Sequence, residues 1–166
     1  MSFKRTSLLT LIGLILLSFP CVAQNQVPEI DHKVTSYSDA ESWEDYKKAD
    51  LDQYYPDLMS PENRKENFEE VYRSWGEFHQ KVYSILKKEG FTWGSDDPQI
   101  YVLNKIYFNP EGEVQHYFFR ILNDSVSMEK RKKFKAILES NFGELKISYS
   151  QTEVFAQCGK SAFPNS

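Results

Sequence analysis

Apolar residues recur at steps of three and four between Pro61 and Glu89, a spacing that places them on one face of a helix. Pro61 suits the first helical position, and Gly90 suits the residue that ends the helix. These 29 residues would extend about 43 Å at 1.5 Å per residue, so we expect a bend near Gly76 or an overhanging end. The apolar stripe, which we interpret as core, comprises Phe68, Val71, Tyr72, Trp75, Phe78, Val82, Tyr83 and Leu86.

Two shorter helices are predicted, one before and one after the long helix. The first begins at Ser38-Asp39-Ala40-Glu41, which has the spacing of a capping box. Its apolar side would carry Ala40, Trp43 and Tyr46. The second covers Ser127 to Asn141, with the Ser127 side chain as the N-terminal cap. Its buried side would carry Phe134, Ile137, Leu138 and Phe142.

Two segments rich in β-branched and aromatic residues predict a hairpin. They are Gln99–Phe108 and Val114–Leu122, and the residues between them, Asn109-Pro110-Glu111-Gly112, suit successive positions of a hairpin loop. A pairing that sets Asn109 opposite Glu113 would place the odd-numbered residues of both strands on one face. The even-numbered residues would then form the other face.

The two predicted faces of the hairpin differ in character. The even-numbered face carries more aliphatic residues, so we expect the helices to pack on it. The odd-numbered face is aromatic but also carries Lys105 and Gln115, so we expect it either to bind a partner or to be covered by Trp43 and Tyr46. The candidate binding residues on this face are Tyr101, Leu103, Tyr107, Tyr117 and Phe119.

The order of the elements predicts an α+β fold, in which a long amphipathic helix packs on a small antiparallel sheet with a β-β-α-β core. Alternation of Leu145, Ile147 and Tyr149 with polar residues predicts a third strand, and Val154–Cys158 either extends it or adds another. The alternative is a cystatin-like or nuclear-transport-factor-like sheet that cradles the helix. We expect a flexible lead-in over 24–37, one α+β domain over 38–160 and a tail over 161–166.

The first 23 residues have the form of a secretory signal peptide. Lys4 and Arg5 precede an apolar run over 8–19, and Cys21 and Ala23 provide small residues before the expected cleavage site. The run is short for a membrane span, so an uncleaved anchor is the less favoured interpretation. A periplasmic or extracellular location follows, with no transmembrane span in the mature chain. Cys158 would be its only thiol, either a partly buried apolar residue or a reactive group open to intermolecular disulfide formation.

The composition indicates a folded protein and argues against one class of partner, nucleic acids. Hydrophobic residues make up 40% and aromatic residues 15% of the 166-residue chain, which indicates a packed core rather than a disordered chain. The formal charge of −4 argues against general nucleic-acid binding, which usually requires a basic surface. Oligomeric state does not follow from the sequence.

No catalytic or cofactor motif is recognisable in the sequence. His32, His79 and His116 lack the spacing of a metal site, and the chain has no glycine-rich phosphate loop and no Gly-x-Ser-x-Gly nucleophile turn. We therefore expect no metal and no cofactor, and an enzyme is not favoured. An enzyme of unknown class with a cleft between helix and sheet stays an alternative, because active sites assemble from residues distant in sequence.

One concentrated group of cations begins the second short helix. Lys130, Arg131, Lys132, Lys133 and Lys135 stand close to its N-terminus, where the helix dipole favours acids instead. They are either a solvated helix surface or a binding site for an anionic partner, such as a lipid head group, a polysaccharide or an acidic protein patch.

The order strand, Asn-Pro-Glu-Gly turn, strand, helix, strand over 99–149 resembles the C-terminal domain of TonB-like proteins. Phe108-Asn109-Pro110-Glu111-Gly112-Glu113-Val114 carries the resemblance at the turn. The leader ending in Ala23-Gln24 is similar to those of secreted proteins of Bacteroidota. The resemblance implies a β-β-α-β fold. Together with the aromatic sheet face, it favours a non-enzymatic envelope protein that binds another envelope protein through its sheet.

Overall fold

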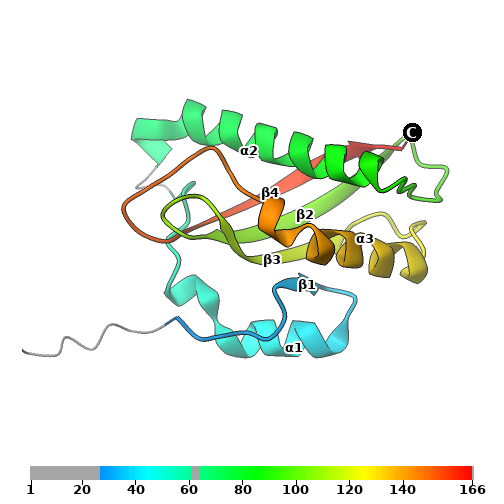
Figure 1. The fold of residues 1–166 in the computed structure, drawn as a ribbon, viewed down its shortest axis with the longest axis horizontal. Helices are drawn as coiled ribbons and strands as arrows, with labels where there is room; N and C mark the ends of the chain where they lie inside the picture. The colour runs from blue at the N-terminus through cyan, green and yellow to red at the C-terminus, as the bar shows by residue number, and fades with distance from the viewer. Residues whose placement is uncertain (1–26, 61–63, 166) are drawn as a thin grey trace, which may run out of the picture.

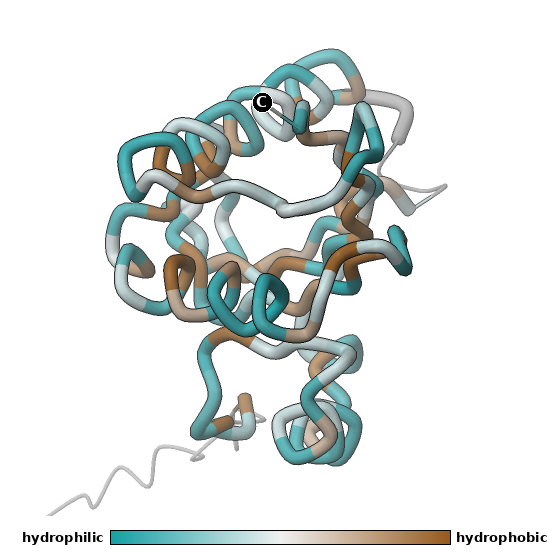
Figure 2. Tube along the Cα trace, turned by 90° about the vertical axis from the view of Figure 1, so that its right-hand side faces the viewer, coloured by the Kyte–Doolittle hydropathy of each residue, from teal (hydrophilic) through white to brown (hydrophobic). Residues whose placement is uncertain are grey.

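The computed structural model describes residues 27–60 and 64–165, which form an α+β fold of three layers (Figure 1). A mixed sheet lies in the middle, with helices α2 (Arg64–Lys88) and α3 (Met128–Ser140) on one face and helix α1 (Ala40–Ala49) on the other. Seen end-on in Figure 2, α1 forms a layer of its own beneath the sheet. The predicted α+β class, with the long helix packed on a small sheet, is confirmed.

Strands β2 (Gln99–Phe108) and β3 (Val114–Ile121) form the predicted hairpin, and β4 (Phe155–Pro164) runs antiparallel to β2. A short strand, β1 (Val34–Ser36), completes the strand order β1-β3-β2-β4, so β1 and β4 are the edges of the sheet. Strand β1 runs parallel to β3, so the sheet is mixed and the prediction of a wholly antiparallel sheet was wrong. The short segment before α1 supplies this parallel strand.

Residues 34–36 of the predicted lead-in and residues 161–164 of the predicted tail belong to strands of this sheet. All three residues of β1 are buried, and Val34 belongs to the main core. Strand β4 continues through Pro164, and Phe163 packs in the core with 2% of its surface exposed. A three-residue strand and a strand containing Gly159 and Lys160 carry too weak a pattern to be found from sequence. The predicted signal peptide lies outside the described residues.

The hairpin loop forms as expected, but the register of the strands differs by one residue. Asn109 N–H donates to the Glu113 carbonyl at 2.9 Å, and Gly112 adopts the left-handed conformation with φ of 83°. A bulge beside the loop then makes Tyr107 pair with His116 instead of Gln115. A one-residue shift moves every later side chain of one strand to the opposite face. The predicted sharing of one face by odd-numbered residues was therefore wrong.

Helix α2 bends earlier than expected. Asn67 has non-helical backbone angles (φ −132°, ψ 19°), whereas Gly76 continues the helix. The predicted stripe is core only in part, because Phe68 and Tyr72 are 42% and 67% exposed. The side of α2 that packs into the main core comprises Val71, Phe78, Val82, Ile85 and Leu86.

The remaining predictions on local structure had mixed outcomes. Ser127 caps α3 as expected, accepting a hydrogen bond from the Lys130 N–H, whereas Asp39 precedes α1 and no capping box forms. Residues 145–150 alternate between buried and exposed as predicted, yet they form no strand and share one bridge, Glu113 with Lys146. The strand that follows α3 in the sheet is instead β4.

Candidate binding groove beside the last strand

The outer edge of β4 is open over part of its length. At the start of the strand, Ala156 N–H donates to the Pro56 carbonyl at 2.8 Å, and Leu58 N–H donates to the Ala156 carbonyl at 2.9 Å. The loop before α2 therefore covers this end of the edge. Because backbone groups in a strand alternate in direction, those of Cys158, Lys160 and Ala162 point outward like those of Ala156.

These outward groups have few partners in the described part of the chain. The Cys158 carbonyl accepts a hydrogen bond from the Gln157 side chain at 2.9 Å. No described residue pairs with the outward N–H groups of Cys158, Lys160 and Ala162, or with the carbonyls of the last two. Unpaired donors and acceptors on a sheet edge are a template for another strand.

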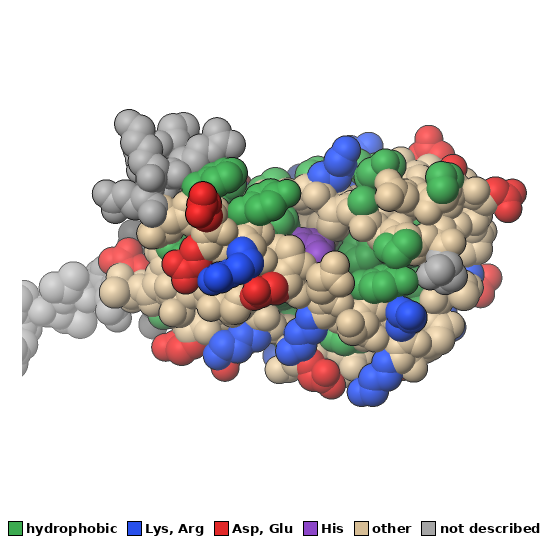
Figure 3. Space-filling model, turned by 90° about the horizontal axis from the view of Figure 1, so that it is seen from above, with side chains coloured by type: hydrophobic (Ala, Val, Ile, Leu, Met, Phe, Trp, Pro, Cys, Tyr) green, Lys and Arg blue, Asp and Glu red, His purple; other side chains and the backbone are tan. Residues whose placement is uncertain are grey.

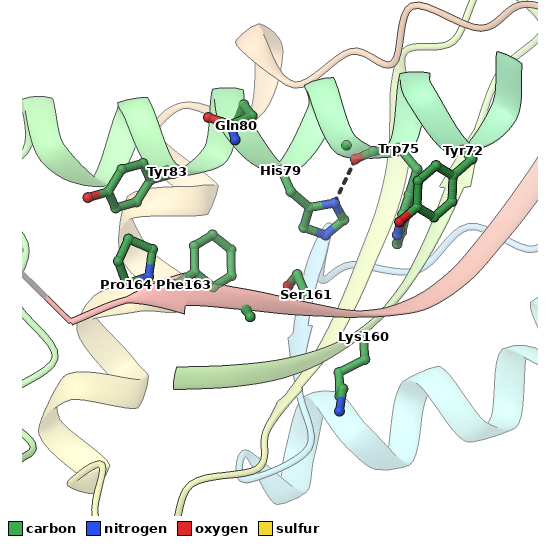
Figure 4. Close-up of a pocket in the computed structure, with 11 residues that line it drawn as sticks. Tyr72, Trp75, His79, Gln80, Tyr83, Lys160, Ser161, Phe163 and Pro164 are labelled. Carbon is green, nitrogen blue, oxygen red and sulfur yellow. Dashed lines mark hydrogen bonds between the residues drawn. The ribbon is translucent and has the colours of Figure 1, made fainter. Parts of the chain in front are cut away.

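A groove of about 370 Å³ lies between α2 and this open edge (Figure 4). Its helix side includes the rings of Tyr72, Trp75, His79 and Tyr83, and its strand side includes Phe163. From above, a histidine side chain is visible between hydrophobic side chains (Figure 3). The groove combines an aromatic wall with a strand edge, which are the two elements that hold an extended peptide.

Trp75 reaches the strand because position 159 has no side chain. A Cβ built on Gly159 would lie 2.8 Å from Trp75 Nε1 and 3.1 Å from Cε2. Such distances are shorter than van der Waals contact, so any larger residue would displace the indole from β4. The glycine thus sets how closely α2 approaches the edge strand.

His79 is a neutral group with one unused acceptor. Its Nδ1 lies 2.9 Å from the Trp75 carbonyl, which assigns the proton to Nδ1. Burial lowers the pKa of His79 to about 4. Nε2 is then a lone-pair acceptor, and it is buried without a partner among the described residues. An unsatisfied buried acceptor costs stability.

The five predicted binding residues do not form one surface. Tyr117 and Phe119 are fully buried on the side of α2 and α3, whereas Tyr101, Leu103 and Tyr107 are on the side of α1. Tyr107 is also fully buried, and its hydroxyl is 2.5 Å from that of Tyr46. Only Tyr101 is exposed, at 37%. The bulge beside the hairpin loop places the two β3 residues of this set on one sheet face and the three β2 residues on the other.

Helix α1 covers part of the sheet face opposite α2 and α3 (Figure 1). Coverage by Trp43 and Tyr46 was one of the two outcomes expected for the aromatic face. The Trp43 and Tyr46 rings lie 5.1 and 4.8 Å from the Phe118 ring. Burial raises the pKa of Tyr46 to about 12, and Tyr107 donates to an Asp52 carboxylate oxygen at 2.9 Å. Trp43 and Tyr46 thus pack α1 against the sheet, and they do not form a binding surface with Tyr107.

Three of the five clustered cations have partners within the chain. Arg131 donates to the carbonyls of Val126, Ile121 and Asn123 at 2.6–2.9 Å. Lys135 pairs with Asp39 at 2.6 Å, and Lys130 donates to Thr92 at 3.0 Å. Lys132 and Lys133 are exposed. Most of this charge therefore fixes loops and α1 against α3.

The other two histidines and the cysteine do not lie together. His32 Nε2 lies 3.8 Å from an Asp45 carboxylate oxygen, and burial lowers the pKa of His116. Cys158 is exposed, and partial desolvation raises the pKa of its thiol. Within the described residues, no three His, Cys, Asp or Glu side chains are grouped to hold a metal ion. No helix in the same residues has the length and apolarity to cross a membrane.

The sequence contained a sign of the groove that the prediction missed. Tyr72, Trp75, His79 and Tyr83 follow one another at helical spacing beside the buried row Val71, Phe78, Val82 and Leu86. A helix resting on one sheet face needs only the second row. The additional aromatic row indicated a second contact surface on α2.

Comparison of the chain with family models, curated proteins and solved structures found no match.

Proposed function

We propose that this protein is a non-enzymatic binding module that receives an extended segment of another protein along the open edge of β4. The observation that carries the proposal is the coincidence of unpaired outward backbone groups at Lys160 and Ala162 with the aromatic groove beneath α2. Main-chain hydrogen bonds would supply affinity, and the groove would take alternate side chains of the added strand.

The charge of Lys160 favours a strand from a different protein over β4 of a second copy as the occupant of this edge. Antiparallel pairing of two β4 edges about their open centre would set Lys160 opposite Lys160 of the second copy. Directly opposed like charges destabilise strand pairing. Lys160 is exposed, and no described carboxylate forms an ion pair with it.

The proposed setting is the periplasm or the cell exterior, because residues 1–23 have the form of a signal peptide. A TonB-like envelope role belongs to the same proposal. It is supported by the order of a turn-linked strand pair, a capped helix and a final strand.

The test removes one outward N–H without touching the ladder to β2. A random heptapeptide library displayed on phage is selected on the wild-type protein, and the enriched peptides are assayed on two variants. Ala162→Pro deletes the outward donor, whereas Ala162→Ser keeps it. Proline is tolerated on strand edges whose N–H points to solvent, so the first variant should fold.

We expect peptides that bind wild type and Ala162→Ser but lose at least tenfold affinity for Ala162→Pro. Circular dichroism and thermal unfolding establish that both variants are folded. Equal affinity for the two variants would refute strand addition. Concentration-dependent self-association that Ala162→Pro abolishes would instead assign the edge to a second copy of the chain.

A further inference from the structure

Lys160, in the middle of the open edge of β4, places a positive charge where a bound segment would lie. Lys160 pairs across the ladder with Leu103, so its side chain extends from the sheet face opposite α2. Its Nζ lies 4.7 Å from the centre of the Tyr101 ring. This cation–π contact positions the charge beside the edge without neutralising it.

The alternation of a strand determines which residues of an added segment meet this charge. In a strand paired with β4, the residue opposite Lys160 has its side chain on the Lys160 face. Its two neighbours project to the other face. That face carries Gly159, Ser161 and the aromatic wall formed by Trp75, His79 and Tyr83.

We infer that the bound segment has an acidic residue opposite Lys160, flanked on both sides by apolar or aromatic residues that enter the groove. This inference rests on the proposed strand addition and specifies its ligand as an apolar–acidic–apolar segment. The chain has a formal charge of −4, so overall charge does not attract acidic peptides. A preference for them would have to come from a local cation.

Lysines on edge strands also serve to discourage pairing with other chains. That role predicts a different behaviour, because a lysine that only repels would favour no particular peptide. Neutralising it would then improve binding of all extended segments equally. The two roles are therefore separable by the sequences that the edge selects.

The experiment selects the displayed heptapeptide library separately on wild type, Lys160→Gln, Lys160→Glu and the control Lys133→Glu. Lys133 is exposed on α3 and does not line the groove, and this control changes the net charge as much as Lys160→Glu does. We expect wild type and Lys133→Glu to enrich Asp or Glu between apolar residues, and Lys160→Glu to enrich Lys or Arg there. An enriched acidic peptide should bind Lys160→Glu about fivefold more weakly than wild type, as expected for an exposed ion pair.

Salt provides a second measurement. Binding of an acidic peptide to wild type should weaken at about 0.5 M salt, where exposed charges are screened, and binding to Lys160→Gln should not. Identical peptide sequences from wild type and Lys160→Glu would overturn the inference, as would uniformly tighter binding to Lys160→Gln. If those peptides still lose affinity for Ala162→Pro, the proposed strand addition stands. Peptides insensitive to Ala162→Pro would refute both.

Discussion

Replacing Tyr117 by phenylalanine tests the buried polar network that joins three strands of the sheet. Tyr117 on β3 donates its hydroxyl to Asn104 Oδ1 on β2 at 3.0 Å, and both side chains are fully buried. Asn104 Nδ2 in turn donates to Ser161 Oγ on β4 at 2.9 Å and to the Val102 carbonyl at 3.1 Å. Burial raises the pKa of Tyr117 well above its usual value, so the hydroxyl stays protonated and donates.

Tyr117→Phe keeps the ring and removes only the donor, which leaves Asn104 Oδ1 unsatisfied and away from water. Loss of one partner from a buried hydrogen bond costs about 1–3 kcal/mol. For a domain of this size, the corresponding fall in Tm is roughly 3–12 °C. Urea unfolding followed by fluorescence measures the free energy of unfolding, and the m-value should not change.

Tyr101→Phe is the matched control on the neighbouring strand. Its hydroxyl donates to Gln99 at 3.1 Å on the exposed surface, where water replaces the lost partner. We expect its free energy of unfolding to stay within about 0.5 kcal/mol of wild type. Equal losses for the two variants would show that the Tyr117–Asn104 bond does not stabilise the sheet as described.

Three further predictions concern His79, α1 and the thiol. Because the pKa of His79 is about 4 in the folded protein and about 6.5 when unfolded, the unfolded state binds more protons between these values. Stability should thus be complete above the higher pKa and fall as pH decreases to the lower one, and urea titrations of His79→Gln should show a flatter dependence. Trp43→Ser should expose Phe118, lower Tm and increase binding of a hydrophobic dye; an unchanged dye signal would mean that α1 does not cover the sheet there. Cys158 should react with iodoacetamide in the folded protein, more slowly than a free cysteine because its pKa is raised; complete protection until unfolding would contradict its exposure.

The sequence predicted the elements that have strong local signals. Helix α3 with its Ser127 cap, the hairpin loop at Asn109 and the central part of α2 each follow from side-chain spacing or turn chemistry. Strand β1 does not, because three residues have no period and are held by pairing with β3 and by burial.

The candidate site was less predictable than the fold because it depends on register and topology. The register shift between Tyr107 and Phe108 moves the side chains of β3 to the opposite face from the one predicted. Gln115, the extra residue of the bulge, is not a residue type that predicts a bulge. The groove also requires β4 to be an edge strand beside α2. That neighbourhood arises from the pairing of β4 with β2, which are distant in sequence.

Amide hydrogen exchange along β4, measured with and without a selected peptide, tests the central claim most directly. In the free protein, the outward amides of Cys158, Lys160 and Ala162 should exchange fast, and those of Gly159 and Ser161, which face β2, should exchange slowly. Saturating peptide should slow exchange at Lys160 and Ala162 to the rate of their inward neighbours. Fast exchange at both outward amides while the peptide is bound would contradict strand addition to β4.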